Sequence, residues 1–526
     1  MAAKTQSKPN FFSRFLNFVE WAGNLLPHPV TLFAYFTLAI ILFSGFAQWM
    51  GLEVIDPRPV GAKGRSADGI IKAVSLLSAE GIRWLYENLV KNFTNFAPLG
   101  TVLVALLGVG VAEGSGLIRT AVRSFILKAP RSLVTFNLVF AGILSNTASE
   151  LGYVVLIPLG GYIFKSIGRH PLVGMAATFA GVSGGYSANL LIGTLDPLLA
   201  GITQEAARLI APEYTVHAAV NWYFMMASTF VIAGIGTWVT EKIVEPKLGT
   251  YDESHADEND QRGASLLKET TPLEIKGMKW AFVSTLILSA ILLLCVVPQG
   301  AILRDPETGA ILKSPFLKGI VSSIFVFFLV PGVVYGKITG AFKSDKDVIA
   351  SMAKSMSTMG LYIVIVFAAA QFINCFKWTN LGLIFAVKGA QWMQELGLQG
   401  GLIFFPFIIV CALVNLSLGS ASAQWAATAP IFVPMLMLLG FSPEVIQAAY
   451  RIGDSSTNII TPMMSYFGLI LAFAYRFDKR TGVGTIISTM LPYSILFLLS
   501  WSVLFYVWVF VFGLPVGPGA PTYFTP

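Results

Sequence analysis

The sequence is poor in charge. Asp, Glu, Lys and Arg make up 12% of the 526 residues, whereas hydrophobic residues make up 55% and the mean hydropathy is +0.71. A soluble domain contains about 25% charged residues, so the composition excludes an ordinary soluble fold and indicates a polytopic membrane protein. The net charge of +7 is expected from basic loops that face the cytoplasm. We therefore expect the lipid bilayer, and no nucleic acid, as a partner.

Residues that serve metal or nucleophilic chemistry are also scarce. The three cysteines, Cys295, Cys375 and Cys411, lie in or beside apolar segments without a CxxC spacing, and the four histidines are scattered. The sequence contains no Walker loop, no HExxH and no GxSxG motif. We therefore predict that the protein is not an enzyme and needs no cofactor. Because there is no ATP-binding motif, any transport should be driven by an ion gradient.

Long apolar runs are abundant. A membrane-spanning helix needs about 20 apolar residues. Seven runs of this kind lie near 29–51, 97–117, 219–241, 279–298, 316–338, 350–377 and 484–513, and two interrupted runs lie at 170–203 and 443–475. The predicted fold class is an all-α polytopic membrane protein with about nine transmembrane helices.

Two further apolar stretches predict re-entrant hairpins. The stretch 133–166 has basic residues on both flanks, so the positive-inside rule places both of its ends in the cytoplasm. The stretch 400–440 has almost no basic residues beside it and is expected to enter from outside. The same rule places the N-terminus in the cytoplasm and the C-terminus in the periplasm. The loop 52–96 carries six basic residues on the predicted outer side, and we expect 69–91 to form an amphipathic surface helix.

The polar, acidic segment 242–278 predicts a cytoplasmic linker between two similar halves, 1–241 and 279–526. Each half contains a hairpin with a small-polar break, "SNTASE" or "GSASAQW", followed by a helix broken at "GGYSANLLIGTLDP" (184–197) or "GDSSTNIITP" (453–462). Inverted repeats with broken helices are the sequence signature of a secondary transporter.

The spacing within the two halves supports this repeat. Asn146 precedes Pro158 by twelve residues, as Ser422 precedes Pro434. Each half then has a Ser-x-Asn triplet, which ends at Asn189 in the first half and at Asn458 in the second. Non-helical backbone at membrane depth survives only where protein or a water-filled cavity covers it, so these breaks predict one shared polar cavity.

Charged residues near the second break are the main candidates for function. Arg451 and Asp454 are three residues apart and can pair on one helix face. We expect Arg451 to hold a substrate carboxylate and Asp454 to couple transport to an ion; the alternative is a structural ion pair. Asp196, after the first break, either carries a proton in a low-dielectric site or caps a helix.

Uncharged residues of the hairpins and breaks complete the candidate site. Trp425 either stacks on an aromatic substrate or fills apolar space. Ser422 and Asn146 at the hairpin tips are expected to contact substrate or ion, together with Asn189 and Asn458. The two prolines of the second broken helix, Pro443 and Pro462, are expected to shape helices.

Three motifs carry a resemblance to a known family. These are "SNTASELGYVVLIPLG", "GSASAQWAATAPIFVPMLMLLGF" and "AYRIGDSSTNIITPMMSYFG", and they resemble the AbgT family of p-aminobenzoyl-glutamate transporters, in particular its efflux-linked branch. The resemblance runs essentially end to end. It implies a homodimer with nine transmembrane helices and two re-entrant hairpins per subunit. The family's functional residues map onto Asp196, Ser422, Trp425, Pro443, Arg451, Asp454 and Pro462.

A weaker resemblance concerns the first hairpin tip. The motif at Ser145, Asn146 and Thr147 is similar to the sodium and carboxylate motif of dicarboxylate transporters in the wider superfamily, which implies a sodium site there.

Two functions follow from the residues and the resemblance together. The first is export of p-aminobenzoate-type folate metabolites and sulfonamide antimetabolites across a bacterial inner membrane by proton antiport. The second is uptake of p-aminobenzoyl-glutamate coupled to protons or sodium. A channel is the third class, and it is disfavoured because the polarity gathers at two hairpin-and-break sites and does not line a continuous pore.

Overall fold

The computed structural model describes residues 27–62, 65–127, 130–148, 152–256, 270–312 and 314–524. Residues 149–151 of the first predicted hairpin and 257–269 of the predicted linker lie outside these ranges. The described N-terminal half contains α2 Pro29–Trp49, α3 Ala79–Thr94, α4 Ala97–Gly114, α5 Leu117–Leu127, α6 Val134–Ser145, α7 Ile157–Ser166, α8 Pro171–Phe179, α9 Leu195–Ala207, α10 Trp222–Val239 and α11 Glu245–Leu248.

The second half is also helical. It contains α13 Pro272–Val296, α14 Pro315–Lys318, α15 Ile320–Thr339, α16 Asp345–Ser357, α17 Gly360–Trp378, α18 Leu381–Glu395, α19 Phe404–Leu418, α20 Ala421–Leu438, α21 Pro443–Asn458, α22 Phe467–Phe477 and α23 Val483–Tyr506. Among the described residues the exception to the all-α fold is a small antiparallel sheet of β1 Glu53–Ile55 and β2 Ile70–Lys72.

Nine helical segments of the described chain are long and apolar enough to cross a membrane. The number agrees with the prediction, but the membership differs. Seven of the nine correspond to the uninterrupted runs of the sequence, and the other two are the arms of the second hairpin, 400–418 and 421–438. The interrupted runs 170–203 and 443–475 are absent from the nine because each consists of shorter helices. The structure thus confirms a polytopic helical membrane fold.

The first broken helix matches its prediction. Helix α8 continues as a π-helical turn, Ala180–Gly184, and residues 185–194 are non-helical until α9 begins at Leu195. The π turn lies where α8 and α6 come into close contact. A Cβ on Gly181 would lie 2.2 Å from the backbone oxygen of Val139 in α6. Only glycine allows the two backbones to approach this closely.

The second broken helix is interrupted later than predicted. Helix α21 runs without a break through Gly453 to Asn458, and the non-helical segment is 459–466. The hydroxyl of Ser456 donates to the Ile452 carbonyl at 2.7 Å, and that of Thr457 donates to the Gly453 carbonyl at 2.9 Å. Such bonds satisfy small polar side chains inside a helix, so the small polar residues before Asn458 remain helical.

The loop 52–96 differs from the predicted surface helix at 69–91. Strand β2 occupies the start of this stretch, and α3 begins only at Ala79, where Ser78 caps it by accepting from the Gly81 amide at 3.0 Å. The strand pairs antiparallel with β1, with Ile70 opposite Ile55 and Lys72 opposite Glu53.

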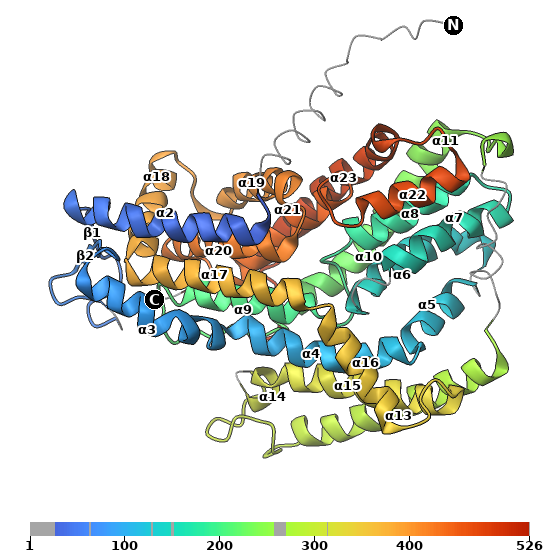
Figure 1. The fold of residues 1–526 in the computed structure, drawn as a ribbon, viewed down its shortest axis with the longest axis horizontal. Coiled ribbons are helices and arrows are strands. Elements are labelled where there is room, and N and C mark those ends of the chain that lie inside the picture. Colours follow the sequence, from blue (N-terminus) through green and yellow to red (C-terminus); the bar gives the residue numbers. More distant parts are fainter. Residues whose placement is uncertain are drawn as a thin grey trace, which may run out of the picture.

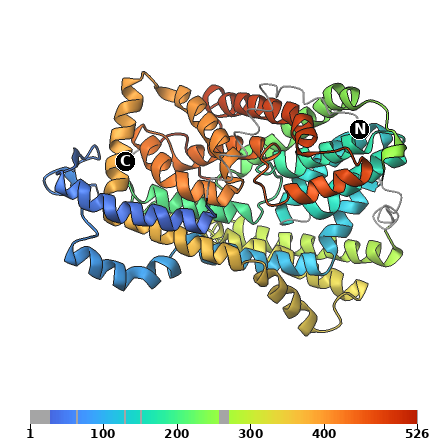
Figure 2. The same cartoon turned by 45° about the horizontal axis from the view of Figure 1, so that its top comes forward.

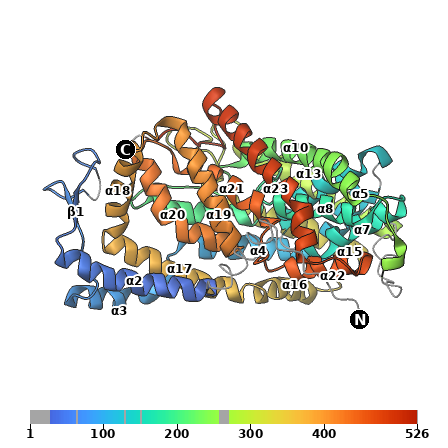
Figure 3. The ribbon, with the colours of Figure 1, turned by 90° about the horizontal axis from the view of Figure 1, so that it is seen from above.

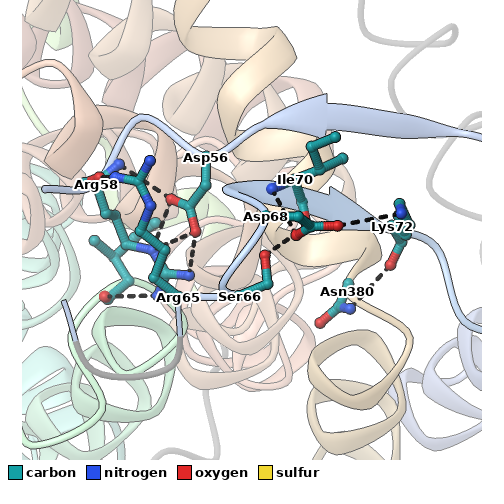
Figure 4. A network of polar contacts seen from close by, with 9 residues as sticks. Asp56, Arg58, Arg65, Ser66, Asp68, Ile70, Lys72 and Asn380 are labelled. Carbon is teal, nitrogen blue, oxygen red and sulfur yellow. Dashed lines mark hydrogen bonds and ion pairs between the residues drawn. The ribbon is translucent and has the colours of Figure 1, made fainter. Parts of the chain in front are cut away.

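A buried ion pair fixes this two-stranded hairpin (Figure 4). The Arg58 guanidinium donates to both carboxylate oxygens of Asp56, with the shortest distance 2.6 Å, and it also donates to the Ile210 carbonyl at 3.4 Å. Arg65 donates to the Arg58 carbonyl, and Asn380 donates to the Lys72 carbonyl at 2.9 Å. The loop is therefore attached to the ends of α9 and α17.

The elements form an elongated bundle. In Figure 1, helices α2, α17, α9, α3 and α4 run roughly along the long axis of the molecule, and α13 and α15 lie toward the lower edge. The teal helices of the first hairpin and the orange helices of the second lie toward opposite ends of the molecule in Figure 2. The C-terminus returns to the end that holds α18 in Figure 3.

Candidate functional site

A cavity of about 270 Å³ lies where the two hairpin tips meet the two broken helices. The first tip contributes Asn146, and the second contributes the consecutive residues from Gly419 to Ser422. The break segments contribute Tyr186, Thr194, Asn458 and Tyr466 among others. The remaining described lining residues are Val102, Leu106, Tyr153, Leu195, Leu198, Met359, Tyr362, Met464 and Ser465. The sequence prediction of one shared cavity is therefore matched by a cavity that both halves build.

The first hairpin tip packs on the break of its own half. The Asn146 side-chain amide donates to the Gly185 carbonyl at 3.5 Å, and the Thr147 hydroxyl donates to Asn189 Oδ1 at 3.0 Å. A Cβ on Gly193 would lie 3.1 Å from the Asn146 backbone oxygen. Asn189 is thus used as an internal acceptor and does not line the cavity, whereas Asn146 does.

The second hairpin repeats this arrangement through Asn415, which the sequence reasoning missed. Its side-chain amide donates to the Asp454 carbonyl at 2.7 Å and to Asn458 Oδ1 at 2.8 Å. The two residues of this amide-to-carbonyl bond are 39 positions apart, as Asn146 and Gly185 are in the first half. The structural counterpart of Asn146 is therefore Asn415, and not Ser422 as the proline spacing indicated.

The tip between α19 and α20 needs glycine at its turn. Gly419 has φ +57°, and a Cβ there would lie 2.9 Å from the Met463 backbone. The tip therefore packs directly against the non-helical segment after α21. This packing places Ser422, in the first turn of α20, at the cavity.

Arg451 pairs with the other half of the protein. Its Nη2 lies 2.6 Å from Asp196 Oδ1, and both side chains are almost fully buried, at 2% and 3% exposure. Asp196 lies in the first turn of α9, where its Oδ2 also accepts from the Gly193 amide at 2.7 Å. The predicted pairing of Arg451 with Asp454 is thus replaced by an ion pair between repeats, because α9 packs against α21 and offers a closer carboxylate.

Asp454 is buried, and few hydrogen bonds offset the cost of burying its carboxylate. Its Oδ1 accepts a long 3.4 Å hydrogen bond from the Tyr450 hydroxyl, and its Oδ2 has no partner among the described residues. The Nε of Arg451 likewise has no partner within the described chain. Buried polar atoms are nearly always paired, so these two unpaired atoms on α21 mark a place where a proton, an ion or a substrate group can bind.

Trp425 is enclosed by protein. The side chain is fully buried, and its ring stacks on Tyr450 with 4.2 Å between centroids and 23° between planes. Its Nε1 donates to the Thr203 hydroxyl at 2.8 Å, which in turn donates to Gln447 Oε1 at 2.6 Å. Gln447 then donates to Asn221 Oδ1 at 2.7 Å. Trp425 therefore links α20 to α9, α21 and the start of α10, and it is not part of the described cavity wall.

The two prolines lie at helix boundaries. Pro443 is the first residue of α21, behind the Ser442 N-cap that accepts from the Val445 amide at 3.3 Å. Proline is favoured there because the first helical position has no use for an amide proton. Pro462 lies in the non-helical segment after α21. Both positions agree with a helix-shaping role.

The first hairpin tip offers few free oxygens for a cation. The Ser145 hydroxyl donates to the Gly142 carbonyl at 2.6 Å, and the Thr147 hydroxyl is used by Asn189. The Oδ1 of Asn146 has no partner among the described residues. A sodium site at Ser145, Asn146 and Thr147 stays a prediction.

The candidate residues therefore form two layers. Asn146, Ser422 and Asn458 line the cavity, whereas Asp196, Trp425, Arg451 and Asp454 are buried on the elements that build it. Sequence reasoning missed Asn415, Thr203, Gln447 and the cavity tyrosines. A signal existed for Asn415, because it is a lone amide within an apolar helix, and such residues are rare and functional in membranes.

Comparisons with known proteins agree with this architecture. The model of the AbgT putative transporter family matches residues 14–524. The p-aminobenzoyl-glutamate transport protein of Escherichia coli (strain K12) is 37% identical over 502 residues, which is 95% of each chain.

Two solved structures share the fold. The structure of Neisseria gonorrhoeae MtrF, described as illuminating a class of antimetabolite efflux pumps, superposes with a TM-score of 0.91 at 62% identity, covering 97% of this chain and all of that one. The Alcanivorax borkumensis YdaH transporter, reported to have an unusual topology, gives 0.86 at 45% identity, covering 94% and 100%. Matches of this extent, on a chain whose two hairpin tips close over one cavity, show that the protein belongs to the AbgT family of membrane transporters.

Proposed function

We propose that this chain is a secondary transporter of the bacterial inner membrane that exports p-aminobenzoate-type folate metabolites and sulfonamide antimetabolites in exchange for protons. The observation that carries this proposal is the cavity built by both hairpin tips and both broken helices. Binding at the interface of two repeats is how secondary transporters expose one site to either side of the membrane. The likeness to MtrF, described as an antimetabolite efflux pump, favours export.

The buried charges suggest how substrate and proton compete. Arg451 has one donor atom without a partner within the described chain, and its other contact, Asp196, is a carboxylate that a substrate carboxylate can replace. Asp454 has an unpaired carboxylate oxygen. A buried ionised carboxylate without a partner is costly, so a proton on Asp454 relieves that cost. In this scheme Asp196 pairs with Arg451 again as the substrate leaves, and a proton then enters on Asp454.

We also propose a homodimer with the N-terminus in the cytoplasm and the C-terminus in the periplasm. The second candidate function is uptake of p-aminobenzoyl-glutamate coupled to protons or sodium. It is favoured by the name of the E. coli relative and by the partnerless Oδ1 of Asn146 among the described residues at the first hairpin tip.

The test uses purified protein in liposomes loaded with radiolabelled p-aminobenzoyl-glutamate or sulfamethazine, under imposed proton or sodium gradients. Wild type is compared with Asp454→Asn and with Glu241→Gln, a control that removes an exposed carboxylate. We expect a proton gradient to drive substrate movement in wild type and in the control, with a loss of at least tenfold in Asp454→Asn. Movement that requires sodium and survives in Asp454→Asn would overturn proton antiport and favour the uptake function.

A further inference from the structure

The two proposed substrate classes differ in their acidic groups. A p-aminobenzoate derivative carries a carboxylate, whereas a sulfonamide antimetabolite does not. What they share is an aminophenyl ring with its amine in the para position. A site that recognises what the two classes share must therefore contact the ring and the amine.

Aromatic side chains are concentrated on the cavity wall. Four tyrosines of the described chain line it, Tyr153, Tyr186, Tyr362 and Tyr466. Trp425 is absent from this wall and already stacks on Tyr450. The structure thus offers tyrosine rings, and not the tryptophan, to a molecule inside the cavity.

Two of these tyrosines form a platform between the repeats. The rings of Tyr153 and Tyr466 are parallel within 11°, with centroids 4.6 Å apart. Tyr153 comes from the π-helical turn Gly152–Leu156 that leads into α7, and Tyr466 directly precedes α22. The platform therefore depends on how the two halves are placed relative to each other. A third ring is fixed because the Tyr362 hydroxyl donates to the Pro98 carbonyl at 2.9 Å.

An acceptor for the amine lies on the same wall. Asn146 lines the cavity and is 7% exposed, its amide donates to Gly185, and its Oδ1 has no partner in the described part of the chain. An aromatic amine has N–H donors and no positive charge near neutral pH, so a neutral carbonyl oxygen can accept from it and no charged partner is needed.

We propose that this cavity is the aminophenyl subsite of the transporter: the ring packs on the Tyr153–Tyr466 platform, and the para-amine donates to Asn146 Oδ1. The inference rests on the proposed function and deepens it by naming the part of the substrate that the cavity recognises. It also assigns Trp425 a positioning role, because its ring and its Nε1 are both engaged by protein.

The experiment measures equilibrium binding to the full chain in nanodiscs with two pairs of probes. The first pair is benzoyl-glutamate and its ring-saturated analogue, cyclohexanecarbonyl-glutamate, neither of which carries an amine. The second pair is p-aminobenzoyl-glutamate and benzoyl-glutamate, which lacks the amine. The quantity compared is the affinity ratio within each pair, so that a variant that merely loses active protein leaves the ratio unchanged.

We expect Tyr466→Leu to lower the aromatic-to-saturated ratio about two- to tenfold, the range of an aromatic pair, while Tyr466→Phe keeps it. Asn146→Ala should lower the ratio for the amine pair and leave the ring pair unchanged. The matched control is Tyr475→Leu, on the exposed surface of α22. If Tyr466→Leu does not fold, Tyr153→Leu, at the other ring of the platform, serves as the second wall variant.

The outcomes separate this inference from the proposed function. A ring ratio that is unchanged in the wall variants, or that falls only in Trp425→Leu, overturns the tyrosine subsite and leaves the transport function standing. A wild type that binds none of the probes overturns the proposed function and the subsite together. A ring ratio that falls in the wall variants and survives in Tyr466→Phe supports the subsite.

Discussion

At the scale of single residues, the partner of Arg451 decides how the centre of the protein is built. Sequence spacing places Asp454 on the same helix face, but the structure places Asp196 of the other repeat at 2.6 Å. Three residues along a helix bring two side chains near each other, yet they do not determine which carboxylate a long guanidinium reaches. The i,i+3 rule is a weak preference, and a buried charge pairs where a packed helix supplies the better geometry.

This pairing predicts the stability of variants. Arg451→Gln should lower the thermal unfolding temperature in detergent strongly, since breaking a buried ion pair costs about 3–5 kcal/mol by leaving a charge unpaired. Adding Asp196→Asn should restore most of that loss, whereas adding Asp454→Asn should not. The control is Arg480→Gln, whose exposed pair with Asp478 is worth at most about 1 kcal/mol. Recovery with Asp454→Asn instead would show that Arg451 pairs along its own helix.

At the scale of elements, small polar residues were the clearest signal for the helix breaks, and they also caused the clearest wrong prediction. The run in α21 looked like a helix break, but its hydroxyls bond back to carbonyls of the same helix, and the break comes only after Asn458. The first break needed no such correction, because "GGYSAN" begins with two glycines that lack hydroxyls and favour an irregular backbone. The loop 52–96 was also misassigned in part, since contacts distant in the sequence hold its hairpin, such as the hydrogen bond from Arg58 to the Ile210 carbonyl.

The buried ion pair beside the β1–β2 hairpin leads us to predict that the local stability of this hairpin depends on pH. Burial alone raises the pKa of Asp56, but the hydrogen bonds and charge of Arg58 outweigh it and hold that pKa below its usual range. A carboxyl whose pKa is lowered by folding stabilises the loop above its unfolded pKa of about 3.9, and this contribution is lost as the pH falls further. The protection of residues 52–62 and 65–76 against hydrogen exchange, taken relative to the intrinsic exchange rate at each pH, should therefore fall below about pH 4.

A variant separates this ion pair from general acid effects. Arg58→Ala should accelerate exchange of the same segment at neutral pH, because it removes the guanidinium that offsets the burial of Asp56. Lys72→Ala, which breaks the exposed pair with Asp68 at 3.2 Å, should change the exchange little. Equal effects of the two variants would contradict a special role for the buried pair.

At the scale of the whole molecule, segments far apart in the sequence tie the two halves together. The Ser187 amide in the first break donates to the Ser455 hydroxyl of α21 at 3.1 Å. The C-terminal segment contacts both halves: the Phe224 amide donates to the Val516 carbonyl at 3.0 Å, and the Ser442 amide to that of Thr522 at 3.2 Å. The tail thus connects the start of α10 in one half to the start of α21 in the other.

This connection predicts the effect of one glycine. A Cβ on Gly517 would lie 2.2 Å from the Val220 backbone oxygen, so Gly517→Val must push the tail away from the loop. We expect a loss of about 1–3 kcal/mol, seen as a lower unfolding temperature and faster proteolysis near residues 211–221. Gly468→Ala is the control, since an added Cβ there meets nothing within 4 Å. Unchanged proteolysis in Gly517→Val would mean that the tail does not hold this loop.

The sequence by itself determined the membrane class, seven of the spans, the first small-polar break and the family, because apolar length and long local motifs are properties of consecutive residues. Tertiary structure alone decided the pairing of Arg451 with Asp196, the match of Asn146 with Asn415, the enclosure of Trp425 and the tyrosine wall. Each of these depends on which helices pack together and on where a side chain finds its partner. Such partners lie up to several hundred residues away, where no local periodicity reports them.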